Sequence, residues 1–152
     1  MNARLDYFNA APEGFQILLQ QEQYLKEQFE QLPNLSLTLW ELIKLRVSQI
    51  NQCAFCIDMH SADALKNGET IHRLIGLYAW NEMPLYNEHE KIALGWAENL
   101  SRNSNTDEQE YQSVISAFSE QGVVVLALAV NAINSWNRIA KTFKPDIGSL
   151  SN

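Results

Sequence analysis

The feature that most constrains the fold is the run VVVLALAV at residues 123–130, which leads into a helical pattern that Pro145 ends. A helix that is apolar on all sides must be buried on all sides, because no face of it suits water. In a chain of 152 residues, this predicts a place at the centre of a helical bundle or in a subunit interface. Asn131 and Asn134 interrupt the pattern and need hydrogen-bond partners if they are buried. The run is much shorter than the roughly 20 apolar residues of a membrane span, so we expect no transmembrane helix.

Helix signals recur along the rest of the chain, and no segment alternates as a half-buried strand would. The patterns predict helices at residues 14–30, 38–50, 53–67, 70–80, 87–100, 106–119 and 121–143, with a polar loop at 101–106. Thr38 with Glu41, and Asn87 with Glu90, have the spacing of a capping box. The sequence therefore predicts one all-α domain over residues 1–152, a bundle of six or seven helices.

The composition excludes several classes of partner. The chain has 18 acidic and 11 basic residues, a formal charge of −7. This charge suits neither nucleic acid, whose phosphates attract Lys and Arg, nor an anionic membrane surface. The N-terminal stretch has no continuous apolar core and lacks the pattern of a secretory signal. We therefore expect a cytoplasmic protein, in a compartment where stable structural disulfides are uncommon.

Both cysteines of the chain stand together as a CxxC pair, Cys53 and Cys56, and His60 follows four residues later. In a reducing compartment this spacing indicates redox chemistry or metal binding more than a structural staple. The pair begins a predicted helix, whose unpaired N–H groups favour a thiolate over a thiol. His60 lies one helical turn beyond Cys56 on the same face, where it can accept the thiol proton.

A carboxylate in the preceding helix has the right spacing to face this histidine. Suppose that residues 51–52 form a tight turn between antiparallel helices. Glu41 then lies nine residues before the last residue of one helix, and His60 seven residues after the first of the next. At about 1.5 Å of rise per residue, these positions are ~13 Å and ~10 Å from the turn, nearly level with each other. A carboxylate behind the imidazole fixes its tautomer and stabilises the imidazolium. The candidate site residues are therefore Glu41, His60, Cys56 and Cys53, and a dithiol cycle on them needs no bound cofactor.

The stretch from Glu41 to His60, ELIKLRVSQINQCAFCIDMH, resembles the core motif of the AhpD-like alkylhydroperoxidases of the carboxymuconolactone decarboxylase superfamily. EKIAL at residues 90–94 and NSWNR at residues 134–138 also resemble the shorter, single-domain members. The resemblance implies an all-helical fold that assembles into dimers and higher oligomers, often hexamers. It also implies a thiol-dependent peroxidase.

The resemblance further implies a role for each residue of the motif. Cys56 would attack the hydroperoxide, Cys53 would resolve the product into a disulfide, and Glu41 with His60 would relay protons. An external dithiol would reduce the disulfide, and lipoyl-bearing proteins supply it in the best-known case. Phe55 stands where the best-known peroxidases have a histidine, a departure that bears on rate and substrate more than on the dithiol chemistry. Decarboxylase members generally lack the CxxC pair, so its presence argues against that activity.

Other interpretations of the same residues stay open at this point. Glu41 can be only the capping partner of Thr38, His60 a packed helical histidine, and the cysteines small buried apolar residues. Cys53, Cys56, His60 and Glu41 can also be the four ligands of a zinc ion. The alternative to an enzyme is a non-catalytic oligomeric binding protein or redox sensor that uses the cysteine pair as a switch.

Overall fold

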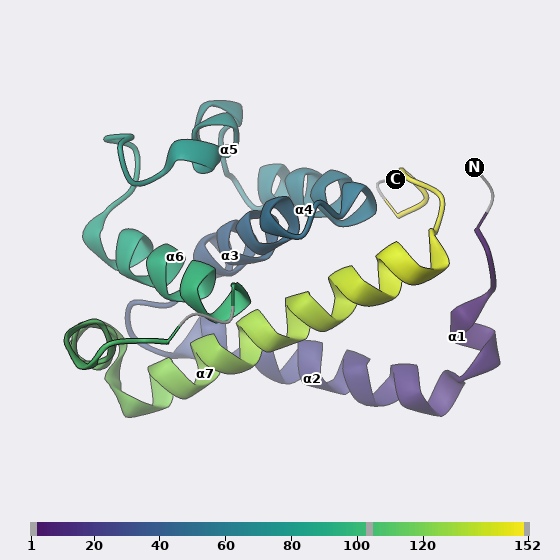
Figure 1. Ribbon diagram of the computed structural model, residues 1–152, viewed down its shortest axis with the longest axis horizontal. Helices are drawn as coiled ribbons and strands as arrows, with labels where there is room; N and C mark the ends of the chain where they lie inside the picture. Colours follow the sequence, from purple (N-terminus) through teal and green to yellow (C-terminus); the bar gives the residue numbers. More distant parts are fainter. Residues whose placement is uncertain (1–2, 103–104, 151–152) are drawn as a thin grey trace.

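The computed structural model describes residues 3–102 and 105–150, and every regular element in that part of the chain is helical. Figure 1 shows the bundle. Its elements are α1 (Tyr7–Ala10), α2 (Pro12–Gln31), α3 (Leu37–Ile50), α4 (Ala54–Lys66), α5 (Ile71–Gly76), the 3₁₀ turn η1 (Leu77–Ala79), α6 (Glu88–Ser101) and α7 (Glu108–Phe143). The predicted all-α bundle is confirmed. The predicted loop at 101–106 falls partly on residues 103–104, which lie outside the described residues.

The long helix α7 crosses the middle of the molecule and packs against α2, α3, α4 and α6 (Figure 1). Leu126, Val130 and Ile133 on this helix are buried in the main hydrophobic core. Val124 is 58% exposed, so the prediction that this helix is buried on every side is wrong for the single chain. The other helices of the bundle cover only part of its circumference. That a second subunit covers the open face stays a prediction.

The continuous apolar run at residues 123–130 is too short to cross a membrane. The whole helix α7, however, is long and apolar enough to do so by length and composition alone. Within its most apolar 18-residue window, 44% is buried inside the bundle. Core helices of soluble proteins meet the same criterion. The packing of α7 against four neighbouring helices identifies it as the core helix of this bundle.

Two predicted helices are joined in α7 across a kink. Ser119 has non-helical dihedral angles (φ 66°, ψ 169°), at the point where the sequence predicts one helix to end and the next to begin. This combination of angles is almost confined to glycine and costs another residue about 1–3 kcal/mol, and here it redirects the chain. The sequence predicts this helix to begin at residue 106. Asp107 caps it in the structure, because its side chain accepts a hydrogen bond from the Glu110 backbone N–H.

One of the two predicted capping boxes is correct. Asn87 and Glu90 form the reciprocal pair of hydrogen bonds at the start of α6. The box expected from Thr38 and Glu41 is wrong, because Ser36 caps α3 and its side chain accepts from the Leu39 N–H at 3.1 Å. The helix therefore starts earlier, and its carboxylate at position 41 is too deep in the helix to serve as a cap partner.

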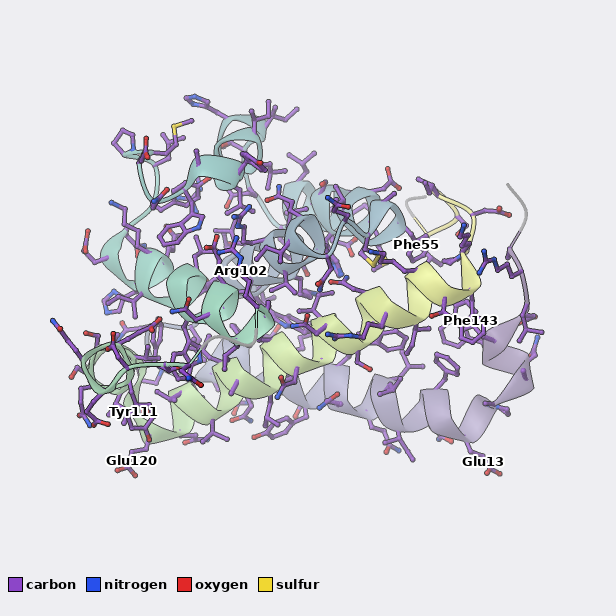
Figure 2. All side chains as sticks on the ribbon, in the orientation of Figure 1. Glu13, Phe55, Arg102, Tyr111, Glu120 and Phe143 are labelled. Carbon is purple, nitrogen blue, oxygen red and sulfur yellow. A yellow bond between two sulfur atoms is a disulfide. The ribbon has the colours of Figure 1, made fainter. Side chains whose placement is uncertain are left out.

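The short helix α1 was not predicted from the sequence. Its Tyr7 ring stacks on Phe143 at the end of α7, with ring centroids 5.2 Å apart. The backbone N–H of Arg4 also donates to the Phe143 carbonyl at 2.9 Å. Phe143 and Phe55 lie at the same end of the molecule (Figure 2), so the N-terminal segment is brought beside the start of α4. These contacts join residues far apart in sequence, which helical periodicity cannot reveal.

Candidate functional site

The helices α3 and α4 form the predicted hairpin. The break between them is Asn51 and Gln52, and Gln52 adopts a left-handed φ of 53°. The Cys53 backbone N–H donates to the Ser48 carbonyl at 3.0 Å, which closes the turn. Because the turn is this tight, the two helices run back alongside each other and their side chains meet at matching levels.

A cluster of amides fixes the turn against α7. The Asn51 side-chain amide donates to the side-chain oxygens of Asn134 (2.8 Å) and Asn137 (2.9 Å). Asn137 donates in turn to the Ser48 hydroxyl at 3.0 Å, and Lys141 donates to the Asn51 carbonyl at 2.7 Å. Asn134 and Asn137 are buried, so each would be costly without these partners. The sequence analysis required a hydrogen-bond partner for Asn134 if it is buried, and the hairpin turn supplies that partner.

Glu41 and His60 meet across the hairpin, as the arithmetic from the turn predicts. His60 Nδ1 lies 3.2 Å from Glu41 Oε2, and both side chains are buried. The other carboxylate oxygen, Oε1, lies 2.6 Å from Lys44 Nζ. The view of Glu41 as only a cap partner is therefore wrong, because its carboxylate is engaged by an imidazole and an ammonium group.

The electrostatics of this group decide which nitrogen of His60 is the base. Burial alone would raise the pKa of Glu41, but the hydrogen bond with His60 and the charge of Lys44 hold that pKa below its ordinary value. Glu41 is thus ionised near neutral pH and can only accept hydrogen bonds. The proton of a neutral His60 is therefore on Nδ1, and Nε2 is the nitrogen free to accept another.

Lys44 is the residue of the site that the sequence analysis missed. Its Nζ lies 3.7 Å from the centre of the Trp40 ring, and its side chain is buried. An ammonium group at this depth needs the Glu41 carboxylate, since an unpaired buried charge is very costly. The signal was present in the sequence, because Glu41 and Lys44 are three residues apart on one helix, a spacing typical of ion pairs.

Cys53 and Cys56 are joined by a disulfide at the start of α4. Cys53 is the N-cap residue and Cys56 lies in the first turn, and both side chains are almost fully buried. In this form the chain offers no thiolate to a zinc ion. Among the described residues, Glu41, His60 and Asp63 do place candidate metal ligands within 4.8 Å of one another. Lys44 already neutralises the Glu41 carboxylate, however, and its charge opposes a cation there.

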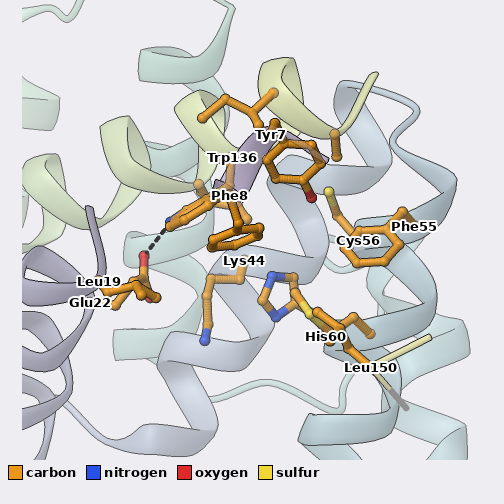
Figure 3. Close-up of a pocket in the computed structure, with 14 residues that line it drawn as sticks. Tyr7, Phe8, Leu19, Glu22, Lys44, Phe55, Cys56, His60, Trp136 and Leu150 are labelled. Atoms are coloured by element: carbon orange, nitrogen blue, oxygen red, sulfur yellow. Dashed lines mark hydrogen bonds between the residues drawn. The ribbon is translucent and has the colours of Figure 1, made fainter. Parts of the chain in front are cut away.

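Cys56 and His60 both line one pocket of about 190 Å³, shown in Figure 3. We call it the apolar pocket. Apart from His60, Lys44 and Glu22, its walls are apolar or aromatic, and they come from α1, α2, α4, α7 and the C-terminal tail. The main apolar contributors are Phe8, Leu19, Phe55, Met59, Trp136 and Ile139. Glu22 accepts a hydrogen bond from the Trp136 indole N–H at 3.0 Å, and this bond holds its carboxylate at the pocket wall (Figure 3).

The ion pairs of Glu41 give a prediction for stability against pH. A carboxylate whose pKa is lowered by folding stabilises the folded state above its unfolded pKa, and this contribution is lost as the pH falls through the folded pKa. We expect the free energy of unfolding of the wild-type protein to decrease as the pH drops below about 4.5. Glu41→Gln should flatten that part of the curve. Lys44→Met should make this loss smaller, because it removes a charge that lowers the pKa of Glu41 in the folded state.

Urea unfolding followed by circular dichroism, at a series of pH values and one protein concentration, measures these curves. Glu13→Gln, on the exposed surface of α2, is the matched control and should keep the wild-type curve. A Glu41→Gln curve as steep as that of wild type would contradict the pairing of Glu41 with His60 and Lys44.

Comparisons with known proteins agree on the family. A profile of the carboxymuconolactone decarboxylase family matches residues 18–99, more than half of the chain. The uncharacterized protein YdfG of Bacillus subtilis (strain 168) is 43% identical over 142 residues, which cover 92% of this chain and 93% of YdfG.

Solved structures extend the likeness to the whole bundle. A protein of unknown function from Agrobacterium tumefaciens, whose suggested role is that of the antioxidant defence protein AhpD, is 32% identical with a TM-score of 0.85. The match covers 94% of this chain and 96% of that protein. The debrominase Bmp8 in its apo form has a TM-score of 0.80 over 95% of this chain and 76% of its own, at 17% identity, a likeness of fold alone. The chain thus belongs to the carboxymuconolactone decarboxylase family, as an AhpD-like member.

Proposed function

We propose that this protein is a thiol peroxidase that reduces small organic hydroperoxides through Cys56, as part of an antioxidant defence. The observation that carries the proposal is the apolar pocket, because one cysteine of a redox pair and a histidine backed by an ionised carboxylate both line it. A nucleophile, a base and a group that orients the base are the three parts that covalent catalysis requires. The AhpD designation of the Agrobacterium relative agrees with this activity.

The first half of the reaction begins with both cysteines reduced. His60 Nε2 takes the proton of the Cys56 thiol, and Glu41 stabilises the imidazolium that results. The thiolate in the first turn of α4 is further favoured by the N–H groups of the helix start. It attacks the terminal oxygen of the hydroperoxide, the O–O bond breaks, and the departing alkoxide takes the proton from His60. The products are an alcohol and a sulfenic acid on Cys56.

The second half closes the disulfide. The Cys53 sulfur attacks the sulfenic sulfur of Cys56, the S–O bond breaks, and hydroxide leaves with the proton of the Cys53 thiol as water. One hydroperoxide and two thiols thus become one alcohol, one water and the disulfide, the form of the pair in the structure. An external dithiol must then supply two electrons and two protons to reduce it. No step requires a bound cofactor.

The size and lining of the apolar pocket indicate the substrate class. An apolar cavity of roughly 150 Å³ holds a benzene molecule, and this pocket is about 190 Å³. Phe55, in place of the histidine of the best-known peroxidases, adds an apolar wall next to Cys56. We therefore propose hydroperoxides with a small aromatic or branched alkyl group, such as cumene hydroperoxide, as better substrates than hydrogen peroxide, which offers no apolar surface to bury.

The cysteine variants test the proposed activity. With cumene hydroperoxide and excess dithiothreitol, Cys56→Ser should lose turnover while its helical content and assembly stay unchanged. In the absence of dithiothreitol, reduced Cys53→Ser should stop at the sulfenic acid, which dimedone traps on Cys56. Wild-type protein that shows no turnover with any dithiol would contradict the peroxidase and favour a redox sensor on the same scaffold.

A histidine variant tests the proton relay. His60→Gln keeps a hydrogen-bonding side chain but cannot accept a proton, so the rate of Cys56 oxidation should fall by about 100-fold or more near neutral pH. The loss should shrink above about pH 8.5, where solvent deprotonates the thiol directly. Stopped-flow measurement of reduced protein with cumene hydroperoxide gives both rates. His72→Gln, exposed on α5, is the control, and an unchanged rate in His60→Gln would contradict the relay.

A further inference from the structure

The two cysteines of the disulfide line two different hollows. Cys56 lines the apolar pocket, whereas Cys53 lines a second and wider hollow of about 700 Å³. Phe55 and Ala140 line both and so form the wall between them. Each cysteine is at most 2% exposed. The two hollows therefore offer separate approaches to the two cysteines of the pair.

The second hollow is basic at its rim, and we call it the basic hollow. Lys141 and Lys144, from the end of α7, line it and are exposed. Lys141 Nζ is held at the hairpin turn by the Asn51 carbonyl, 2.7 Å away. Arg4 is fixed beside this rim, since its guanidinium donates to the Thr142 carbonyl at 3.1 Å.

The charge of this rim differs from that of the whole protein. The hollow has two lysines, Lys141 and Lys144, and one acidic residue, Asp146, in its lining, in a chain with a net charge of −7. The backbone at Lys144 is left-handed (φ 50°) and ends α7, so the chain turns there and Pro145 to Ile147 form another wall of the basic hollow. A local excess of positive charge beside a reducible sulfur attracts anionic reagents.

We propose that the basic hollow is the entrance for the reductant, and that the reductant is a small dithiol carrying a negative charge, which attacks Cys53. This proposal rests on the peroxidase cycle and assigns its two half-reactions to opposite sides of the disulfide. Desolvation of a charged dithiol in the apolar pocket would be costly. The apolar pocket therefore binds the hydroperoxide, and the dithiol enters through the basic hollow.

The chemistry of the leaving group agrees with attack at this sulfur. A thiolate of the reductant bonds to Cys53 Sγ, the disulfide breaks, and Cys56 leaves as a thiolate. Cys56 lies in the first turn of α4 and shares its pocket with His60, so the better stabilised of the two thiolates is the one released. The second thiol of the reductant then attacks its own sulfur in the mixed disulfide and releases Cys53. The reductant becomes a cyclic disulfide, and both cysteines become thiols with the two protons it gave up.

A matched pair of reductants tests the charge. Dihydrolipoate and dihydrolipoamide carry the same dithiol, and only the first is anionic. The oxidised protein should be reduced faster by dihydrolipoate, and the rate ratio should fall as salt is added. Lys144→Gln should lower the ratio about twofold to fivefold, the size of one partly exposed charge contact, and leave the rate with dihydrolipoamide unchanged. Lys66→Gln, at the far end of α4, is the control and should keep the wild-type ratio. Equal rates for the two reductants in wild-type protein would overturn the proposal.

The position of attack is tested separately. Oxidised protein is treated with the anionic monothiol 2-mercaptoethanesulfonate, free thiols are alkylated at once, and fragment masses locate the mixed disulfide. We expect the mixed disulfide on Cys53. A mixed disulfide on Cys56 would overturn the proposal. Both experiments start from the disulfide and use no peroxide. Their failure therefore leaves the peroxidase step untouched, and failure of peroxide to oxidise the thiols leaves their result intact.

Discussion

The contact between Glu41 and His60 depends on one constraint, the tight turn between α3 and α4. The turn sets the register of the hairpin, and a slip of one residue would rotate a side chain by about 100° around its helix. The turn is held against α7 by a hydrogen bond from the side-chain amide of Asn51, in the turn, to that of Asn137, in α7. The packing of the turn against α7 thereby fixes the geometry of the site, because a proton relay must be held within hydrogen-bond distance.

The charges around His60 balance each other. Glu41 alone beside His60 would be a buried anion without a permanent partner. Lys44 neutralises that anion at 2.6 Å, while the carboxylate still orients the imidazole through its other oxygen. The cluster of three groups is thus neutral overall when His60 is neutral. Burying a neutral cluster is much less costly than burying a lone charge.

The sequence was sufficient for the parts of the site that depend on local spacing. The CxxC pair, the histidine one turn later and the carboxylate across the turn follow from helix geometry and one assumed turn, and the contact of Glu41 with His60 is where that geometry places it. The ion pair of Lys44 with Glu41 could have been predicted in the same way, from their spacing of three residues on one helix. The wall formed by Phe8 and the exposure of Val124 were not, because both depend on contacts between distant segments or on faces that no helix covers. Helix starts were off by one or two residues where two polar residues compete to be the cap.

The disulfide joins two environments that suit opposite reagents. On the Cys56 side an apolar wall and a neutral relay suit an uncharged hydroperoxide, and on the Cys53 side lysines suit an anionic dithiol. Phe55 separates the two, which gives a physical reason for an aromatic residue between the cysteines. A cycle with substrate and reductant on different sides avoids competition between them for one pocket.

The most direct test of the central claim is to count free thiols by mass before and after one equivalent of cumene hydroperoxide is added to reduced protein. We expect the loss of both thiols and a decrease of about two hydrogen masses, with Cys53 and Cys56 linked. Two thiols that stay reduced in excess hydroperoxide would contradict it, and the family likeness would then describe the fold without the peroxidase activity.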